Sequence, residues 1–446
     1  MNYKILKKAD LSLFKSLERE VGRQKEGLEM IPSENYTSAA VLDAVGSILT
    51  NKYSEGYPYK RYHAGNEFID EIEELAQERA KKLFNVPYVN VQPYSGSPAN
   101  HAVYLAVLKP GDTVLGMNLY DGGHLTHGWK TSFSGLYYHS VPYHVNSEGV
   151  VDFSEVIRLV SEHKPKLIWV GGSAYTKEYE FEVFSKIADD VGAYLAADIA
   201  HVAGLVAGGA HKSPAPFVHI ITSTTHITLR GPRGAMIMVT KKGLKKDPEL
   251  GDKIDKAVFP GLQGGPHNHV IAGIAVCLKE TSSEKFKKYA KQVVRNAKAL
   301  ARSLKKEGLK LVGGGTDNHL LLVDLTQTNG VGSGIFVQDA LSISGITVNK
   351  NMIPMEPSSP FYPSGIRLGS PAITSRGMKE KEMEKIGKWV ASVIREAEKY
   401  KLPEGKDERA AYLKKFRRDI AKNKNLLKIR EEIKKLCKRF PVPGID

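Results

Sequence analysis

The sequence predicts an α/β protein whose larger domain is built on a mostly parallel sheet. Three observations predict this class: short apolar runs bounded by Gly, Pro or Asp, helical segments between several of them, and a change of pattern near residue 280. Strands that are apolar throughout are typical of sheets covered by helices on both faces. The 446 residues are enough for two or three domains and a large core.

The expected elements of the larger domain follow one another in a regular order. Residues 1–30 are expected to form an N-terminal helix and arm, and the segment DEIEELAQERAKKLF (70–84) has the periodicity and composition of a helix. The expected strands are TVLGMNL (113–119), KLIWVGG (166–172), AYLAAD (193–198), HIITST (219–224) and AMIMVT (235–240). We therefore expect the large domain to cover residues 31–280.

The segment after residue 280 predicts a smaller α+β domain over 281–446. It opens with a long amphipathic helix, SEKFKKYAKQVVRNAKALARSLKKEG (283–308), which ends at Gly308. Short apolar runs, a helix near 333–344 and two more helices follow. The mixture of short strands and helices, without strict alternation, favours an α+β arrangement.

Composition excludes several classes of protein. The chain is 41% hydrophobic and 25% charged, as in ordinary globular proteins. Its beginning has no apolar run typical of a signal peptide, and no stretch approaches the roughly 18 apolar residues of a membrane helix. Cys277 and Cys437 lie far apart without metal-site spacing, so we expect no disulfide framework and a cytoplasmic location.

The net charge of +15 raises the alternative of nucleic-acid binding. The basic residues are concentrated between Lys401 and Arg439, where they alternate with apolar residues and glutamate at helical spacing. We interpret this pattern as solvated helix faces rather than a nucleic-acid site.

The strongest chemical pattern is an apolar strand that ends on Asp198, with His201 three residues later. The polar turn TSTTHITLRGPRGAM (222–236) follows. A carboxylate at a strand end can keep a pyridine nitrogen protonated, which makes the ring an electron sink. The alternative is that Asp198 caps a helix and that the glycine-rich segment is only a turn.

Two further segments carry groups suited to ligands. YSGSPAN (94–100) opens a predicted helix, and small hydroxyl and glycine residues at a helix N-terminus can bind an anion or simply cap the helix. GGHLTHG (122–128) places His124 and His127 three residues apart. No third ligand lies at a typical spacing in the sequence, so we expect no metal and favour an imidazole stacked on an aromatic cofactor.

Together these segments resemble the serine hydroxymethyltransferase (glycine hydroxymethyltransferase) family. The resemblance rests on ten motifs in family order, MIPSENYTS, NKYSEGYP, GDTVLGMNL, GGHLTHG, DIAHVAGL, LRGPRG, VFPGLQGGP, GGTDNHL, ITVNKN and SGIRLGSPAIT. It implies a fold-type I pyridoxal-phosphate-dependent transferase that converts serine and tetrahydrofolate reversibly to glycine and methylenetetrahydrofolate, in one-carbon metabolism and glycine biosynthesis. It also implies a homodimer or tetramer with shared active sites, no membrane association, and no nucleic-acid partner.

The resemblance implies roles for individual residues. The cofactor would be held by Ser95, Gly96, Ser97, His124, Ser173, Asp198 and His201, with Gly264 and Gly265 arriving from the neighbouring subunit. The expected catalytic residues are Tyr53 and Glu55, also from the neighbouring chain, together with His226. Ser33, Tyr62 and Arg367 would bind the substrate, and Leu119 and Asn351 the folate.

One position departs from the family pattern in a way that affects chemistry. The family turn Thr-Thr-Thr-His-Lys-Thr-Leu carries the Schiff-base lysine, and here Ile227 stands in its place. Further departures near the same site are His63 after Tyr62, Tyr94, Pro98, Asp121 and Ala235. Pyridoxal phosphate would then be bound without a covalent bond, if at all.

Three explanations of Ile227 remain open. The chain is an active or residually active hydroxymethyltransferase whose multiple turnover is impaired, or a catalytically silent paralogue that binds the cofactor or an amino acid. An engineered or erroneous Lys-to-Ile change, which takes one base, is the third. An isoleucine fills the space of the lysine stem without the cost of burying an amine, so we expect no harm to folding.

Overall fold

The structure is a computed structural model that describes residues 3–445. The chain divides into two compact units. One comprises Ala40–Lys291, and the other joins the residues before Ala40 to those from Gln292 onward. None of the helices in the described part of the chain is long and apolar enough to span a bilayer.

The larger unit is organised around a seven-stranded mixed sheet. In spatial order its strands are β4 (Tyr88–Asn90), β10 (Ala235–Val239), β9 (Ile220–Thr224), β8 (Tyr194–Asp198), β7 (Leu167–Gly171), β5 (Thr113–Met117) and β6 (His139–Tyr143). The strands β6, β5, β7, β8 and β9 are parallel, and β10 is antiparallel to both of its neighbours. All five predicted strands form, which confirms the α/β class with a mostly parallel sheet.

Two strands of this sheet were not predicted. β4 has only three residues, and β6 is an edge strand, HSVPY, whose outward residues are exposed. Neither presents the continuous apolar run by which the other five were found, because an edge strand or a very short strand need not be buried on both faces.

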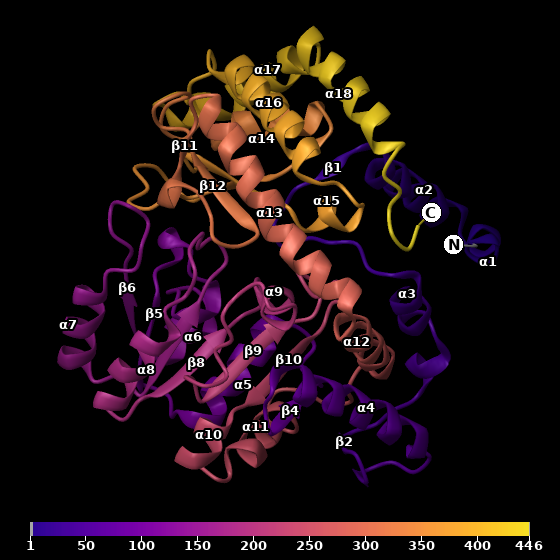
Figure 1. Ribbon diagram of the computed structural model, residues 1–446, viewed down its shortest axis with the longest axis vertical. Helices are drawn as coiled ribbons and strands as arrows, with labels where there is room; N and C mark the ends of the chain where they lie inside the picture. The colour runs from indigo at the N-terminus through magenta and orange to yellow at the C-terminus, as the bar shows by residue number, and fades with distance from the viewer. Residues whose placement is uncertain (1–2, 446) are drawn as a thin grey trace. The chain divides into compact units, whose positions relative to one another are not determined.

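Helices cover the sheet, and the alternate side chains of its strands are buried on both faces. On one face α5 (Gly96–Val107) packs with α11 (Leu250–Val258) against β9 and β10. Their shared core contains the fully buried Trp169. α7 (Phe153–His163) contacts β6, and α8 (Phe181–Asp190) contacts β7 and β8 (Figure 1).

α4 (Glu67–Phe84) illustrates how local sequence sets an element's ends. Acidic residues occupy its first turn and Lys81 and Lys82 its last, which complements the helix dipole. Asn85 ends the helix in the left-handed conformation at φ 53°. α4 packs along α12 (Asn268–Thr281). The other elements of this unit are α3 (Ala39–Val45), β2 (Gly56–Tyr57), β3 (Lys60–Arg61), α6 (Phe133–Tyr137), α9 (Ala203–Ala207) and α10 (Lys241–Lys246).

The second unit is built on a four-stranded antiparallel sheet with the order β11 (Lys310–Leu311), β12 (Leu320–Asp324), β15 (Gly365–Gly369) and β14 (Asn349–Asn351). Its remaining elements are α1 (Lys4–Ala9), α2 (Leu11–Glu26), β1 (Leu28–Glu29), α14 (Gly334–Ile343), β13 (Ile346–Thr347), α15 (Pro371–Ser375), α16 (Glu380–Ala397), α17 (Lys406–Ile420) and α18 (Lys424–Cys437). β1 pairs in parallel with β13, which ties the start of the chain to this unit. The long helix α13 (Glu284–Lys306) runs across the boundary between the two units.

Candidate active site

The carboxyl ends of three adjacent parallel strands bring several predicted residues together. In the sheet register, Gly171 of β7 lies opposite Asp198 of β8, and Asp198 lies opposite Thr222 of β9. Ligands of open α/β sheets bind at this edge, because the loops after parallel strands converge there. The loops after β7, β8 and β9 carry Ser173, His201 and the turn at 225–229.

Asp198 is an ionised carboxylate within a network of donors. Its Oδ2 accepts from Asn100 Nδ2 at 2.8 Å and lies 3.1 Å from His127 Nε2, and its Oδ1 accepts from the backbone N–H of Ala200 at 3.0 Å. Burial by itself raises the pKa of Asp198, but the hydrogen bond and charge of His127, with smaller contributions from His124 and Asn100, hold it well below the usual range. A fixed anion at this point can stabilise a protonated ring nitrogen.

The two histidines of the GGHLTHG segment play different parts. His127 stacks on Trp169 with ring centroids 5.0 Å apart and faces Asp198. His124 Nδ1 lies 2.7 Å from Thr126 Oγ1, and burial lowers the pKa of His124 to about 4. His124 is therefore neutral at physiological pH.

Asp198 is also the third potential metal ligand that sequence spacing did not reveal. The ligand atoms of His124, His127 and Asp198 lie within 4.8 Å of one another. His127 Nε2 and Asp198 Oδ2, however, are at hydrogen-bond distance from each other, and His124 Nδ1 contacts Thr126. These potential ligand atoms are therefore engaged in hydrogen bonds. A proton shared between His127 Nε2 and Asp198 Oδ2 explains why the two atoms lie so close together.

The N-terminus of α5 forms a cradle whose polar groups are of the kind that bind anions. Ser95 is the N-cap residue, and its side chain makes no capping hydrogen bond. A Cβ on Gly96 would lie 2.9 Å from the methyl carbon of Thr224, so only glycine fits there. The hydroxyl oxygens of Thr222 and Thr224 are buried without a hydrogen-bond partner among residues 3–445. Free backbone N–H groups and spare hydroxyls suit a phosphate.

The turn after β9 holds His226 and Ile227 in a fixed backbone. Thr225 Oγ1 donates to Pro232 O at 2.6 Å, and Thr228 Oγ1 donates to His201 O at 3.0 Å. Ile227 is only 4% exposed. Burial, assisted by Arg233, lowers the pKa of His226 to about 4.

Ser173 and Leu119 flank the segment that carries His124. The backbone N–H of Ser173 donates to Gly122 O at 2.7 Å, which joins the loop after β7 to this segment. Leu119 opens a 3-10 turn, Leu119–Asp121, directly after β5. Asp121, one of the departures from the family pattern, lies 2.7 Å from His144 Nδ1.

The residues predicted to reach a neighbouring subunit lie together in one chain. Tyr53 OH lies 3.3 Å from Glu55 Oε1. A Cβ on Gly264 would lie 3.1 Å from Glu55 Oε1, and one on Gly265 would lie 3.1 Å from the Tyr53 ring. Tyr62 projects beside them with 76% of its surface exposed. Four residues from two distant segments thus form a single surface, because the glycines leave room for the Tyr53 and Glu55 side chains.

Three predicted residues belong to the second unit, around β15. Arg367 is 8% exposed and donates through Nε to Asn349 Oδ1 at 3.1 Å. Burial lowers the pKa of Arg367 to about 10, so it stays charged at neutral pH. Asn351 on β14 pairs with Gly365 on the neighbouring strand β15. Ser33 follows Pro32, which packs closely against Gly369 of β15. A Cβ added to Gly369 would lie only 2.5 Å from the Cα of Pro32.

Comparison with known proteins decides the family. The serine hydroxymethyltransferase family model matches residues 6–390. A serine hydroxymethyltransferase of Sorangium cellulosum (strain So ce56) is 49% identical over 441 residues, covering 99% of this chain and 97% of the relative. One of Methanosarcina barkeri (strain Fusaro / DSM 804) is 50% identical over 438 residues, covering 98% and 99%. The chain belongs to the serine hydroxymethyltransferase family.

Serine hydroxymethyltransferases use pyridoxal phosphate and tetrahydrofolate, and the residues present fit the former. The α5 cradle offers N–H groups and hydroxyls to a phosphate, and Asp198 offers a carboxylate to a ring nitrogen. The unsatisfied hydroxyls of Thr222 and Thr224 and the unsatisfied Nδ1 of His226 provide further polar contacts. Buried polar atoms without partners are rare, and a bound polar ligand satisfies them.

The sequence did not identify two residues that contact Asp198, namely Asn100 and His127. Asn100 ended a motif that was interpreted as a helix start, and His127 was weighed only as a metal ligand. Asn100 faces Asp198 because it is one turn of α5 beyond Gly96. Counting helical turns from the cradle would have found Asn100, but no pattern along the chain pairs His127 with Asp198.

Proposed function

We propose that this chain binds pyridoxal phosphate without a covalent bond and catalyses the reaction class of its family, reversible one-carbon transfer between serine and tetrahydrofolate. The observation that carries the proposal is the ionised Asp198 beside the anion cradle of α5. When bound, the cofactor supplies an electron sink for a bond breaking at the substrate's α-carbon. We propose for the site residues the same cofactor, substrate and folate contacts that the family resemblance implies.

The chain's own residues would divide the remaining work. Asp198 would hold a proton on the ring nitrogen, the N–H groups at the start of α5 would neutralise the phosphate, and the neutral His124 would stack on the ring. Arg367 would bind the substrate carboxylate, for which a bidentate guanidinium is well suited. Glu55 would transfer a proton near the substrate hydroxyl.

We further propose a fold-type I arrangement in a homodimer or tetramer with shared active sites. Ala40–Lys291 would be the cofactor-binding domain. The grouping of Tyr53, Glu55, Gly264 and Gly265 supports this, because one surface of one chain could then reach into a neighbour's site.

A second candidate is a catalytically silent paralogue that binds the cofactor or an amino acid. Ile227 favours it, because an alkyl side chain cannot release and recapture the cofactor aldehyde between turnovers. Multiple turnover is the property that separates the two candidates.

The deciding experiment is a visible-light titration of the purified protein with pyridoxal phosphate, with and without glycine, for the wild type, Ile227→Lys and Ile227→Met. We expect all three to bind the cofactor and only the lysine variant to retain it after borohydride reduction. Folate-dependent serine turnover by the wild type would favour the enzyme, and binding without turnover the silent paralogue. Loss of cofactor binding in all three would contradict both candidates.

A further inference from the structure

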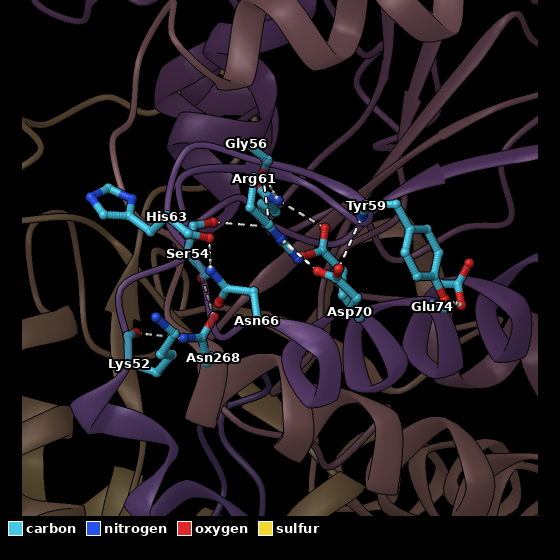
Figure 2. Close-up of polar contacts among 12 residues, drawn as sticks. Lys52, Ser54, Gly56, Tyr59, Arg61, His63, Asn66, Asp70, Glu74 and Asn268 are labelled. Carbon is cyan, nitrogen blue, oxygen red and sulfur yellow. Dashed lines mark hydrogen bonds and ion pairs between the residues drawn. The ribbon is translucent and has the colours of Figure 1, made fainter.

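A buried arginine lies beneath the loop that carries Glu55. Arg61 on β3 donates through Nε to Asp70 Oδ1 at 2.8 Å (Figure 2). It also donates through Nη2 to Glu73 Oε2 at 2.7 Å. The Arg61 side chain is only 3% exposed. The second carboxylate oxygens accept from Tyr59 N at 3.0 Å and from Gln92 Nε2 at 2.8 Å. All four carboxylate oxygens are therefore satisfied.

Stability alone is a weak explanation for such a group. Removing an arginine and two carboxylates from water costs several kcal/mol per ion, and a packed apolar cluster often does as well. Burial raises the pKa of Glu73, and the charge and hydrogen bond of Arg61 oppose that shift. A buried guanidinium whose two carboxylate partners are fully hydrogen-bonded is better suited to fixing one backbone conformation.

The conformation that Arg61 fixes is that of the Glu55 backbone. Arg61 Nη1 donates to the carbonyl of Ser54 at 2.9 Å and to the carbonyl of Gly56 at 2.8 Å, on either side of Glu55. The carbonyl of Glu55 itself accepts from the backbone N–H of Tyr62, at 3.1 Å. Arg61 thus holds the carbonyls of the two residues on either side of the predicted proton-transfer residue.

The rest of this loop is held in the same way. The carbonyl of Lys52 accepts from Asn268 Nδ2 at 2.6 Å, and that of Tyr53 from Asn66 Nδ2 at 3.4 Å. Every backbone carbonyl from residue 52 to residue 56 is therefore hydrogen-bonded. The Tyr53 side chain is nevertheless 56% exposed. A rigid backbone that presents exposed polar side chains is the arrangement that a preorganised site requires.

The network continues toward the phosphate cradle. Gln92 Nε2 also donates to Gly56 O at 2.9 Å, and Gln92 O accepts from Gln263 Nε2 at 2.9 Å. Gln263 Oε1 accepts from the backbone N–H of Tyr94, next to Ser95, at 3.0 Å. One chain of hydrogen bonds thus joins the Glu55 loop to the residue before the cradle.

We propose that Arg61 is a positioning residue that sets the orientation of Glu55 by holding the carbonyls of Ser54 and Gly56. This inference rests on the proposed function for the role of Glu55. A lysine cannot replace Arg61, because a single ammonium cannot reach two carboxylates and two carbonyls in one plane.

The test compares Arg61→Lys with Arg79→Lys. Arg79 is a matched control, since it also lies on this part of the fold, in α4, and donates to a carbonyl, that of Ala275, at 2.6 Å. In the ligand-free proteins, hydrogen–deuterium exchange of peptides covering 52–62 should be faster in Arg61→Lys alone. An unchanged exchange rate in this segment would overturn the inference, regardless of any change in glycine binding.

Glycine titration in the presence of saturating pyridoxal phosphate, followed by absorbance, tests the link to Glu55. We expect Arg61→Lys to raise the glycine dissociation constant about tenfold, as for loss of one or two charge-assisted hydrogen bonds. In a Glu55→Gln background the same change should have little further effect, because Glu55 is the group being positioned.

The exchange and titration experiments distinguish a failure of the Arg61 inference from a failure of the proposed function. An equal effect of Arg61→Lys with and without Glu55, or a loss of thermal stability alone, would show a merely structural arginine and overturn the inference. Absence of any glycine-dependent change in the wild type would contradict the proposed function instead.

Discussion

At the scale of single residues, position 227 has the largest chemical consequence. Ile227 occupies a buried point in the turn after β9, between the half-buried His226 and Thr228, whose hydroxyl is hydrogen-bonded to the carbonyl of His201. An apolar side chain meets no desolvation cost there, whereas an amine would have to be neutral or find an anion. The Ile227 side chain can therefore pack at this point but offers no reactive group.

Replacing Ile227 by lysine should lower stability. We expect Ile227→Lys to reduce the free energy of unfolding by about 1–3 kcal/mol at pH 7, measured by urea titration without cofactor. Burial depresses the pKa of the lysine in the folded state, so the folded protein binds fewer protons than the unfolded chain, and the deficit should shrink as pH rises toward about 10. A deficit that grows with pH would contradict this account.

Asp198 should control cofactor affinity. We expect Asp198→Asn to weaken pyridoxal phosphate binding about 10- to 100-fold, because a neutral amide cannot stabilise a protonated ring nitrogen as an anion does. Because the pKa of Asp198 lies well below its usual range, its contribution in the wild type should persist down to about pH 5. Fluorescence titration from pH 5 to pH 8 measures both effects.

At the scale of elements, the sheet and α5 act as a frame for the ligand groups. Asp198 and Thr222 end neighbouring parallel strands, and α5 directs its N-terminus to the same edge through Gly96. The contact of Gly96 with Thr224 joins the helix to β9 with no room for a side chain. The cradle is thus a property of the packing of α5 on the sheet.

That contact allows a test with a built-in rescue. Gly96→Ala places a Cβ 2.9 Å from the Thr224 methyl carbon, and we expect pyridoxal phosphate affinity to fall at least about tenfold as α5 shifts. Thr224→Ser removes that methyl group and should restore most of the affinity in the double variant. Gly22→Ala is the control, because nothing lies within 4 Å of a Cβ there.

A second element-scale prediction concerns α11 and its contact with β4. Asp255 on α11 accepts from Asn90 Nδ2 at 2.7 Å, and burial raises the pKa of Asp255 to about 6. A raised pKa means that the folded state binds the proton more tightly. The associated stability is complete below about pH 4 and is lost as pH rises through about 6.

Asp255→Asn should therefore stabilise the protein above pH 6. We expect a gain of about 1–3 kcal/mol at pH 7 and nearly none at pH 4, measured as the difference in unfolding free energy between variant and wild type. An amide oxygen can still accept from Asn90, so the packing should survive. Equal gains at both pH values would show that titration of Asp255 is not the cause.

At the scale of the whole molecule, the assembly predicted from the family resemblance can be tested by mixing chains. Asp198 and Glu55 would belong to different subunits of one site, so Asp198→Asn and Glu55→Gln chains should complement each other. A hybrid dimer would contain one site with both residues intact and one with neither. We expect glycine binding at about half of the sites in hybrids, by titration with pyridoxal phosphate present. No recovery above the parent variants would contradict shared sites.

Five of the seven strands of the large sheet followed from the sequence, because strands buried on both faces must be apolar throughout. The short strand β4 and the edge strand β6 were not predicted, because neither has to be apolar throughout its length. Family motifs located Asp198, the cradle and the turn at Ile227, because their chemistry requires particular residue types at particular points.

What only the tertiary structure decided is which distant groups meet. Asn100, His127 and Asp198 converge from a helix, a loop and a strand end, and Arg61 reaches two carbonyls and two carboxylates from separate segments. The sequence by itself determined the class of fold and the resemblance to the family, and it places Ile227 at a position where that resemblance implies a lysine. Burial, protonation and hydrogen-bond geometry depend on neighbours brought together by packing, and no periodicity along the chain encodes those neighbours.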